Sequence, residues 1–431
     1  MSGFTMGSVA ATPPGCGAEA GSRSEANATP PAAEQACVRT DGIDFPVSKS
    51  PVQERRRERW AMRKFLHEYS SLKPVRLCGL APIRSEVELR LSDGGHAGFS
   101  GFKRCGSVWS CPVCAAVVAG KRQRELEDLA KAASEQGYFI SMLTLTLQHS
   151  RGDSIEEIWK GISTGWASVI SGRQWLTAKE QLGIAGYVKA VEVTFGKNGP
   201  HVHLHVIFFT EKNPLTARLR FQRKQGRAKT PYPVIEKTPE DFLAEKWEKG
   251  LAKTGFRMIR EIYDPEKDEF RKPGLTWEVA PPGKGCAAMA RYAAKIQAVA
   301  ISKEATMGQM KQGHGDSRTP FQILASAMQG NEKDLRFWHA WEKKSHGHRQ
   351  MTWSKGLREM FSLEPEKTDE ELVNEDSGGE VVAIIRFDPT EFKRYDWLDL
   401  LEIAETFGAD AARAWLTQRG IVYRLPDPPP V

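Results

Sequence analysis

The chain has 431 residues, of which 40% are hydrophobic, and a formal net charge of +7. That length predicts two or three domains, and the apolar fraction is sufficient for a folded core. No run of about 18 or more apolar residues occurs and no secretion signal precedes the first helix, so we expect no membrane partner. The positive charge favours an anionic partner, although many proteins of other classes share it.

The 7 cysteines are an odd number and cluster unevenly along the chain. Such a pattern is not typical of a disulfide framework and indicates a reducing compartment, the cytoplasm. Residues 1–50 are rich in Ala, Pro, Gly and Ser, a composition that predicts a disordered tail.

Residues 51–136 are expected to hold a basic helix and a cysteine segment. The helix begins near Val52 and carries many arginines, which could either lie on DNA phosphates or form an ordinary solvated face. Cysteines follow in VRLCGL and in KRCGSVWSCPVC. Tetrahedral zinc takes four such thiolates and then has no open position. We therefore predict a structural Zn²⁺ site, with buried cysteines that bind no metal as the alternative; its ligands would be Cys78, Cys105, Cys111 and Cys114.

Residues 137–345 contain the strongest strand signals. Tyr138–Leu147 is a strand by composition, and Ser154 with Glu157 forms a capping box that opens an amphipathic helix. Tyr187–Phe195 is a second strand, and the Asn198-Gly199 turn joins it to a third. We expect an α+β fold with a central antiparallel sheet flanked by helices. We expect residues 346–380 to form a linker. Residues 381–431 are expected to form a small C-terminal α/β appendage with a Pro-rich tail.

The third strand, HVHLHVIFF, alternates histidines with apolar residues. Successive side chains of a strand point to opposite faces, so His201, His203 and His205 share one face. Residues two apart lie ~7 Å from one another, so an adjacent pair can bind one ion, whereas the outer pair can hardly do so. Glu192 lies on the paired strand and is the expected carboxylate ligand. The alternative is a row of exposed polar residues on a half-solvated sheet.

These segments together resemble the rolling-circle replication initiators (Rep proteins) of bacterial plasmids, in the HUH endonuclease superfamily. The resemblance spans roughly residues 75–345. It rests on MLTLTLQH, AVEVTFGKNGPHVHLHVIFF, ARYAAK, RTPFQILA and CPVC. It implies an HUH, ferredoxin-like nuclease core over residues 137–345. The family's His-hydrophobic-His pair falls on His203 and His205, with His201 as the second choice.

The resemblance also implies a reaction. Tyr292 would attack a phosphodiester of single-stranded or hairpin origin DNA, which leaves a 5′-phosphotyrosine and a 3′-hydroxyl primer. Lys295 would supply positive charge near the phenol, and Mg²⁺ or Mn²⁺ would polarise the phosphate. The host helicase and polymerase would be partners in the bacterial cytoplasm. DNA contacts are expected from His149 and from a basic loop that contains Arg218, Arg220, Arg223, Lys224 and Arg227.

In one respect the sequence departs from some relatives. They have a glutamate one helical turn before the tyrosine, where this chain has Ala288. Relaxases and transposases share the histidine pair and the tyrosine, so they are alternatives to a replication initiator. A non-catalytic, zinc-containing DNA-binding protein is an alternative of another class.

Overall fold

The fold is given by a computed structural model, which describes residues 37–40, 43–46, 51–222, 233–264, 268–271, 274–280, 317–375, 378–390 and 396–427. The chain divides into two compact units, Met1–Lys49 and Ser50–Val431. In the first unit, β1 (Cys37–Thr40) and β2 (Ile43–Pro46) pair as antiparallel strands. This hairpin lies in the segment for which disorder was expected. The remaining elements belong to the second unit.

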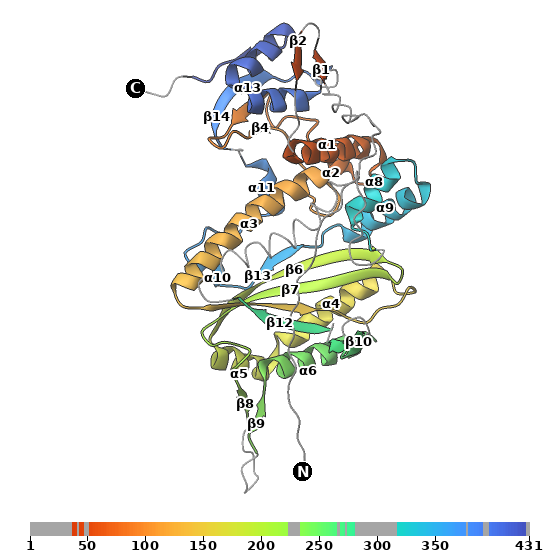
Figure 1. Cartoon of the computed structure of the whole chain (residues 1–431), viewed down its shortest axis with the longest axis vertical. Helices are drawn as coiled ribbons and strands as arrows, with labels where there is room; N and C mark the ends of the chain where they lie inside the picture. Colours follow the sequence, from red (N-terminus) through yellow and green to blue (C-terminus); the bar gives the residue numbers. More distant parts are fainter. Residues whose placement is uncertain are drawn as a thin grey trace, which may run out of the picture. The chain divides into compact units, whose positions relative to one another are not determined.

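The centre of the second unit is a five-stranded sheet of order β12-β5-β7-β6-β13 (Figure 1). The strands are β5 (Phe139–Leu145), β6 (Ile184–Gly196), β7 (Gly199–Thr210), β12 (Leu275–Val279) and β13 (Met351–Trp353). All four pairings are antiparallel. The expectation of an α+β protein with an antiparallel sheet flanked by helices is therefore confirmed.

The β6–β7 hairpin turns at Lys197 and Asn198, with Gly196 opposite Gly199. Gly199 has φ of 89°, a left-handed value that glycine adopts without strain. From this turn the register runs without a shift as far as Gly186 opposite Phe209, and Glu192 pairs directly with His203. The turn thereby fixes which side chains share a face.

One face of the sheet is packed against helices in the largest apolar cluster. Val202, Leu204, Val206 and Phe208 of β7 belong to it, together with aromatic residues such as Trp166 and Trp247. Helices that contribute to this cluster include α4 (Ile155–Val169), α5 (Gly172–Leu182), α6 (Pro239–Ala252), α8 (Pro320–Met328) and α9 (Glu332–Ser345). Ser154 and Glu157 form the predicted capping box at the start of α4.

The other face carries the histidines and is partly covered by α3 (Pro112–Glu135). Leu126 and Leu129 of α3 pack with Ile207 and Phe209 of β7 in a separate cluster, to which β13 and α10 (Leu357–Met360) also contribute. Since Ile207 and Phe209 follow His205 on the same face, α3 covers the end of β7 that lies away from the turn.

A second sheet of order β15-β14-β3-β4 joins two ends of the unit. Its strands are β3 (Glu86–Leu91), β4 (Ala97–Ser100), β14 (Glu380–Arg386) and β15 (Tyr423–Arg424), and α13 (Trp397–Gln418) packs on it. The segment expected to be a separate C-terminal appendage therefore shares its sheet with strands from the cysteine segment. An antiparallel strand needs hydrogen bonds along its edge, and β3 provides them for β14.

The basic helix α1 (Pro51–Tyr69) also contacts the C-terminal helix. Arg57 lies 2.8 Å from Asp399 and 2.5 Å from Glu402, and Arg56 pairs with Glu405. Burial opposes the charge of Arg57, but its hydrogen bonds to Glu402 and Asp399 raise its pKa overall. These arginines thus bind acidic residues of the same chain. The sequence alone suggests either contact with DNA phosphates or a solvated face, and not this pairing.

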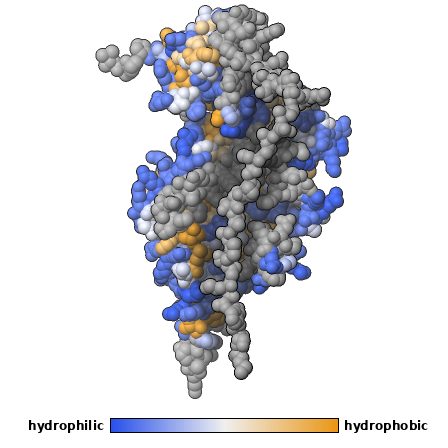
Figure 2. All heavy atoms as spheres, in the orientation of Figure 1, coloured by the Kyte–Doolittle hydropathy of each residue, from blue (hydrophilic) through white to orange (hydrophobic). Residues whose placement is uncertain are grey.

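Several short elements complete the described residues. They are α2 (Lys73–Arg76), β8 (Leu219–Phe221), β9 (Ile235–Lys237), β10 (Ile262–Asp264), β11 (Glu269–Arg271) and α11 (Asp369–Asn374). In the whole described part of the chain, no helix has the length and apolarity needed to span a membrane. The visible face in Figure 2 is mainly hydrophilic, with small hydrophobic patches.

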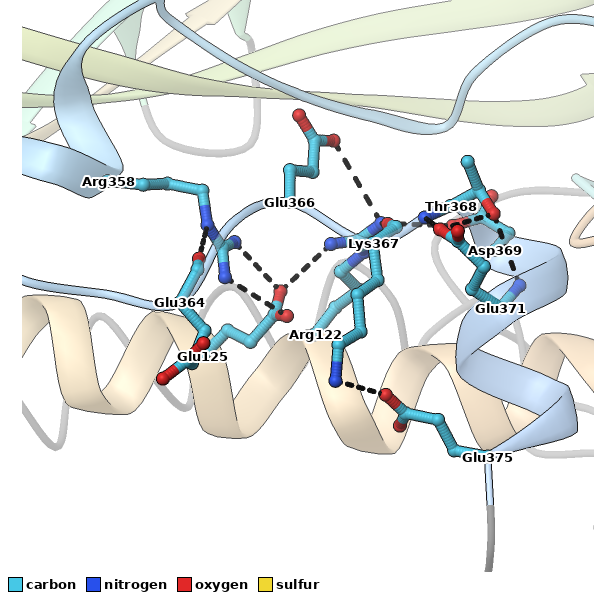
Figure 3. Close-up of polar contacts among 10 residues, drawn as sticks. All are labelled: Arg122, Glu125, Arg358, Glu364, Glu366, Lys367, Thr368, Asp369, Glu371 and Glu375. Atoms are coloured by element: carbon cyan, nitrogen blue, oxygen red, sulfur yellow. Dashed lines mark hydrogen bonds and ion pairs between the residues drawn. The ribbon is translucent and has the colours of Figure 1, made fainter.

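The expected linker, residues 346–380, is structured and tied to α3. Figure 3 shows Arg122 and Arg358 reaching Glu125 from different elements, at 2.9 and 3.3 Å. Arg122 is only 3% exposed and also donates to the carbonyl of Lys367 at 2.6 Å. This segment supplies β13 to the central sheet and then leads into β14, so it belongs to the fold.

We predict that Arg122→Met lowers the free energy of unfolding by roughly 2 to 3 kcal/mol, because it leaves the Lys367 carbonyl without its charged donor and Glu125 with Arg358 alone. Urea denaturation measures the change. Arg124→Met on the exposed side of the same helix is the matched control and should have little effect. Equal stability of the two variants would contradict the structural role of the network.

Candidate functional site

The three histidines of β7 form a row of parallel rings. The centroids of His201 and His203 are 4.3 Å apart, those of His203 and His205 are 5.8 Å apart, and each pair is 5° from parallel. The alternation of the strand places them on one face, as predicted.

Glu192 lies beside this row. It is directly opposite His203 in the β6–β7 register, and its Oε2 is 3.1 Å from Nε2 of His205. Ala190 stands opposite His205, and its small side chain leaves room for the carboxylate to reach the ring diagonally. The carboxylate proposed from the hairpin pattern is thus next to two of the three histidines.

The second nitrogen of His205 has a partner on the neighbouring strand. Thr144 of β5 is directly opposite His205, and its Oγ1 lies 3.0 Å from Nδ1. His205 is 7% exposed, so both of its ring nitrogens are engaged inside the protein. Sequence reasoning did not single out Thr144, although the alternation in MLTLTL indicates which of its residues share a face.

Burial lowers the pKa of two of these histidines, His201 and His203. Burial, with a smaller contribution from His201, lowers the pKa of His203 to about 4. The pKa of His201 is lowered by burial and by nearby His149. Nε2 of His201 is buried without a hydrogen-bond partner among the described residues. Neutral imidazole nitrogens beside a carboxylate are a donor set that suits a divalent cation.

His149 extends the row at the turn of the hairpin. Its ring centroid is 5.1 Å from that of His201, and its Nδ1 is 3.1 Å from the carbonyl oxygen of Asn198. It also lines a cleft of about 390 Å³, whose other walls include Gln148, Asp153, Glu157, Phe256 and Arg257. An open, polar cleft therefore begins where the histidine row ends.

The basic loop lies elsewhere. Arg218 and Arg220 follow the end of β7 opposite to the turn, and β8 contacts α5. Arg220 pairs with Glu236 at 2.6 Å and both are exposed. Tyr292, Lys295, Ala288 and the remaining loop residues Arg223, Lys224 and Arg227 lie outside the described residues.

The four predicted zinc ligands meet at one point. The sulfurs of Cys78, Cys105, Cys111 and Cys114 all lie within 4.8 Å of one another. Cys78 is 3.8 Å from Cys111 and 3.5 Å from Cys114, and Cys105 is 3.7 Å from Cys114. A tetrahedral ion with Zn–S bonds of ~2.3 Å separates its sulfurs by about 3.8 Å. The four cysteines are thus placed to hold a metal ion, and the spacing is compatible with zinc.

Local structure explains how the cysteines converge. Cys111 caps α3 and Cys114 lies in its first turn, while Cys78 and Cys105 are each followed by a glycine, with φ of 72° at Gly79 and 65° at Gly106. A positive φ after each cysteine turns the chain sharply away from the cluster. Hydrogen bonds from the other three thiols lower the pKa of Cys78, and the charge of Arg63 lowers it further. Hydrogen bonds with the same neighbouring thiols, together with burial, instead raise the pKa of Cys111, so the lowering is a property of Cys78.

Comparisons with known proteins agree with this picture in part. The chain is 22% identical to "Protein rep" of Streptomyces lividans over 333 residues, which cover 66% of this chain and 70% of that protein. It is 24% identical to a "Neomycin resistance protein" of Streptomyces cyanogenus over 186 residues, 37% of this chain and 40% of that protein. No protein-family model and no solved structure matches the chain. The resemblance to plasmid Rep proteins is confirmed by the first of these relatives.

We predict that Cys114→Ser removes the bound metal. Zinc analysis of purified wild-type protein should find about one ion per chain, and the variant should have little, because a hydroxyl is a poor replacement for a thiolate. The variant should also melt at a lower temperature, since the metal no longer joins the remaining three cysteines and the start of α3. Cys16→Ser, outside the described residues, is the control. Zinc content unchanged in Cys114→Ser would remove this cluster as the binding site.

Proposed function

We propose that this chain, which resembles the plasmid Rep proteins, initiates rolling-circle replication as an HUH endonuclease that nicks and joins single-stranded origin DNA. The observation that carries the proposal is the placement of Glu192 against the histidine row of β7, within a chain similar to "Protein rep" over 66% of its length. Neither fact alone specifies the reaction, but together they agree with the motifs of the sequence.

The cation site is assigned to His203, His205 and Glu192. Mg²⁺ or Mn²⁺ bound there would supply positive charge beside a scissile phosphate. The imidazole of His203 has a lone pair available at physiological pH, because burial lowers its pKa to about 4. His201, whose Nε2 has no partner among the described residues, is the second choice as a ligand and otherwise a donor to phosphate.

Tyr292 is the proposed nucleophile. Its phenolic oxygen would form the new bond to phosphorus while the bond from phosphorus to the 3′ oxygen breaks, so that one ester replaces another and no water is consumed. The 3′ oxygen leaves with the bonding electrons and takes a proton, which gives the 3′-hydroxyl primer. Lys295, three residues after Tyr292 in the sequence, would favour ionisation of the phenol. The free 3′-hydroxyl can later reverse the step and rejoin the strand.

The remaining features are assigned as follows. The cleft that begins at His149 would hold DNA next to the nick, and the exposed Arg218 and Arg220 would contact phosphates farther along. A structural Zn²⁺ at the four cysteines would fix the start of α3, whose later turns pack on the histidine face of the sheet. Replication of the plasmid by this route requires host helicase and polymerase as partners in the bacterial cytoplasm.

We predict that Tyr292→Phe abolishes covalent attachment to DNA. Wild-type protein incubated with Mn²⁺ and a labelled single-stranded origin oligonucleotide should form an adduct that survives denaturing electrophoresis. The variant lacks the attacking oxygen and should form none. Tyr263→Phe is the matched control, because Tyr263 is 52% exposed. An adduct with Tyr292→Phe would identify another nucleophile, and no wild-type adduct on any candidate origin would favour a non-catalytic DNA-binding protein.

We predict that Glu192→Gln weakens Mn²⁺ binding and reduces nicking by at least about tenfold, since it removes the negative charge from the ligand set while keeping its shape. Calorimetric titration with Mn²⁺ measures the first effect. Glu278→Gln on β12 is the control, because Glu278 is an exposed residue of the same sheet. If both variants bind Mn²⁺ like the wild type, Glu192 is not a ligand.

A further inference from the structure

Thr144 is a residue of the histidine face with no role in the proposal above. It lies on β5, beside the central strand β7, and is directly opposite His205. Its Oγ1 is 3.0 Å from Nδ1 of His205, while Nε2 of the same ring is 3.1 Å from Glu192. The ring is therefore held at both nitrogens, by two different neighbouring strands.

We propose that Thr144 is a positioning residue that holds His205 in the orientation required for cation binding and accepts a hydrogen bond from Nδ1 in the tautomer that binds the cation. This inference rests on the proposed function, because it takes His205 as a ligand. A neutral imidazole has one proton and one lone pair. When Nδ1 carries the proton and donates it to Oγ1 of Thr144, Nε2 presents its lone pair on the side where Glu192 lies. That is the arrangement in which one cation can replace the direct contact between Nε2 and the carboxylate.

The opposite arrangement excludes the cation. If the Thr144 hydroxyl donates to Nδ1, the proton of the ring is on Nε2 and points to the Glu192 carboxylate. His205 and Glu192 then satisfy one another, and the ring has no lone pair left for a metal. A hydroxyl can both donate and accept a hydrogen bond. Thr144 can therefore donate to Nδ1 when His205 contacts Glu192 directly, without metal. It acts as an acceptor from Nδ1 only when Nε2 binds a cation.

The strand context suits this role to a short side chain with a hydroxyl. Thr144 is half-buried in β5, where β-branched side chains have restricted χ1 angles, so its hydroxyl is held near Nδ1. Valine has the same shape without the hydroxyl, and serine keeps the hydroxyl without the methyl group. The inference also favours His203 with His205 as the ligand pair, because His205 is the histidine whose orientation is fixed from β5.

The test measures Mn²⁺ affinity of the intact protein without DNA, by electron paramagnetic resonance of free Mn²⁺. Thr144→Val should bind Mn²⁺ roughly 10- to 100-fold more weakly, as expected for loss of a hydrogen bond behind a metal-ligating histidine. Thr144→Ser should retain wild-type affinity. Thr276→Val is the matched control, because Thr276 lies opposite Thr144 on β12, one strand farther from His205. In ¹⁵N-histidine spectra of the Mg²⁺-loaded wild type, His205 should carry its proton on Nδ1.

The outcomes separate this inference from the proposed function. If His205→Ala abolishes Mn²⁺ binding but Thr144→Val binds like the wild type, Thr144 has no positioning role and the metal site stands. If the wild type binds no Mn²⁺, or His205→Ala binds it unchanged, the proposed ligand set itself is overturned. Should Thr144→Val fail to fold, Thr144→Ala decides: wild-type Mn²⁺ affinity in this variant, which also lacks the hydroxyl, overturns the inference.

Discussion

The register of the β6–β7 hairpin is the constraint on which the histidine site depends. A two-residue turn at Lys197 and Asn198 places Glu192 opposite His203. Side chains alternate between the faces of a strand, so a slip by one residue would move the histidines into the apolar cluster and Val202 and Leu204 onto the open face. The burial of those two side chains, each 1% exposed, opposes any such slip. Packing on one face thus fixes the donor set on the other.

Helix α3 links the two candidate metal centres. It begins at Cys111 and Cys114 in the cysteine cluster, and its later residues Leu126 and Leu129 pack on the face of the sheet that carries the histidines. Between these ends, Arg122 ties it to the segment that follows β13. A metal at the cysteines would therefore stabilise the position of α3 on the sheet, because the helix is anchored along its length. This is a structural role, and it is consistent with four protein ligands and no open position.

The second sheet changes how the chain is divided. Strand β3 from the cysteine segment pairs with β14 from the C-terminal part of the chain, and α1 pairs its arginines with acidic residues of α13. The early and late parts of the second unit are one structure, closed by strand pairing and by ion pairs such as that between Arg57 and Glu402. Deleting either part would leave an unpaired strand edge on the other.

The sequence by itself determined the local elements and which histidines share a face. Alternation predicted β7, the Asn-Gly turn predicted the hairpin and the position of Glu192, and the spacing of the cysteines predicted their cluster. These are short-range patterns, set by backbone geometry within a few residues. Only the tertiary structure decided that β14 pairs with β3, that β13 lies in the expected linker, and that Thr144 meets Nδ1 of His205. Such contacts join residues far apart in the chain, and no local sequence pattern predicts which strands pair with one another.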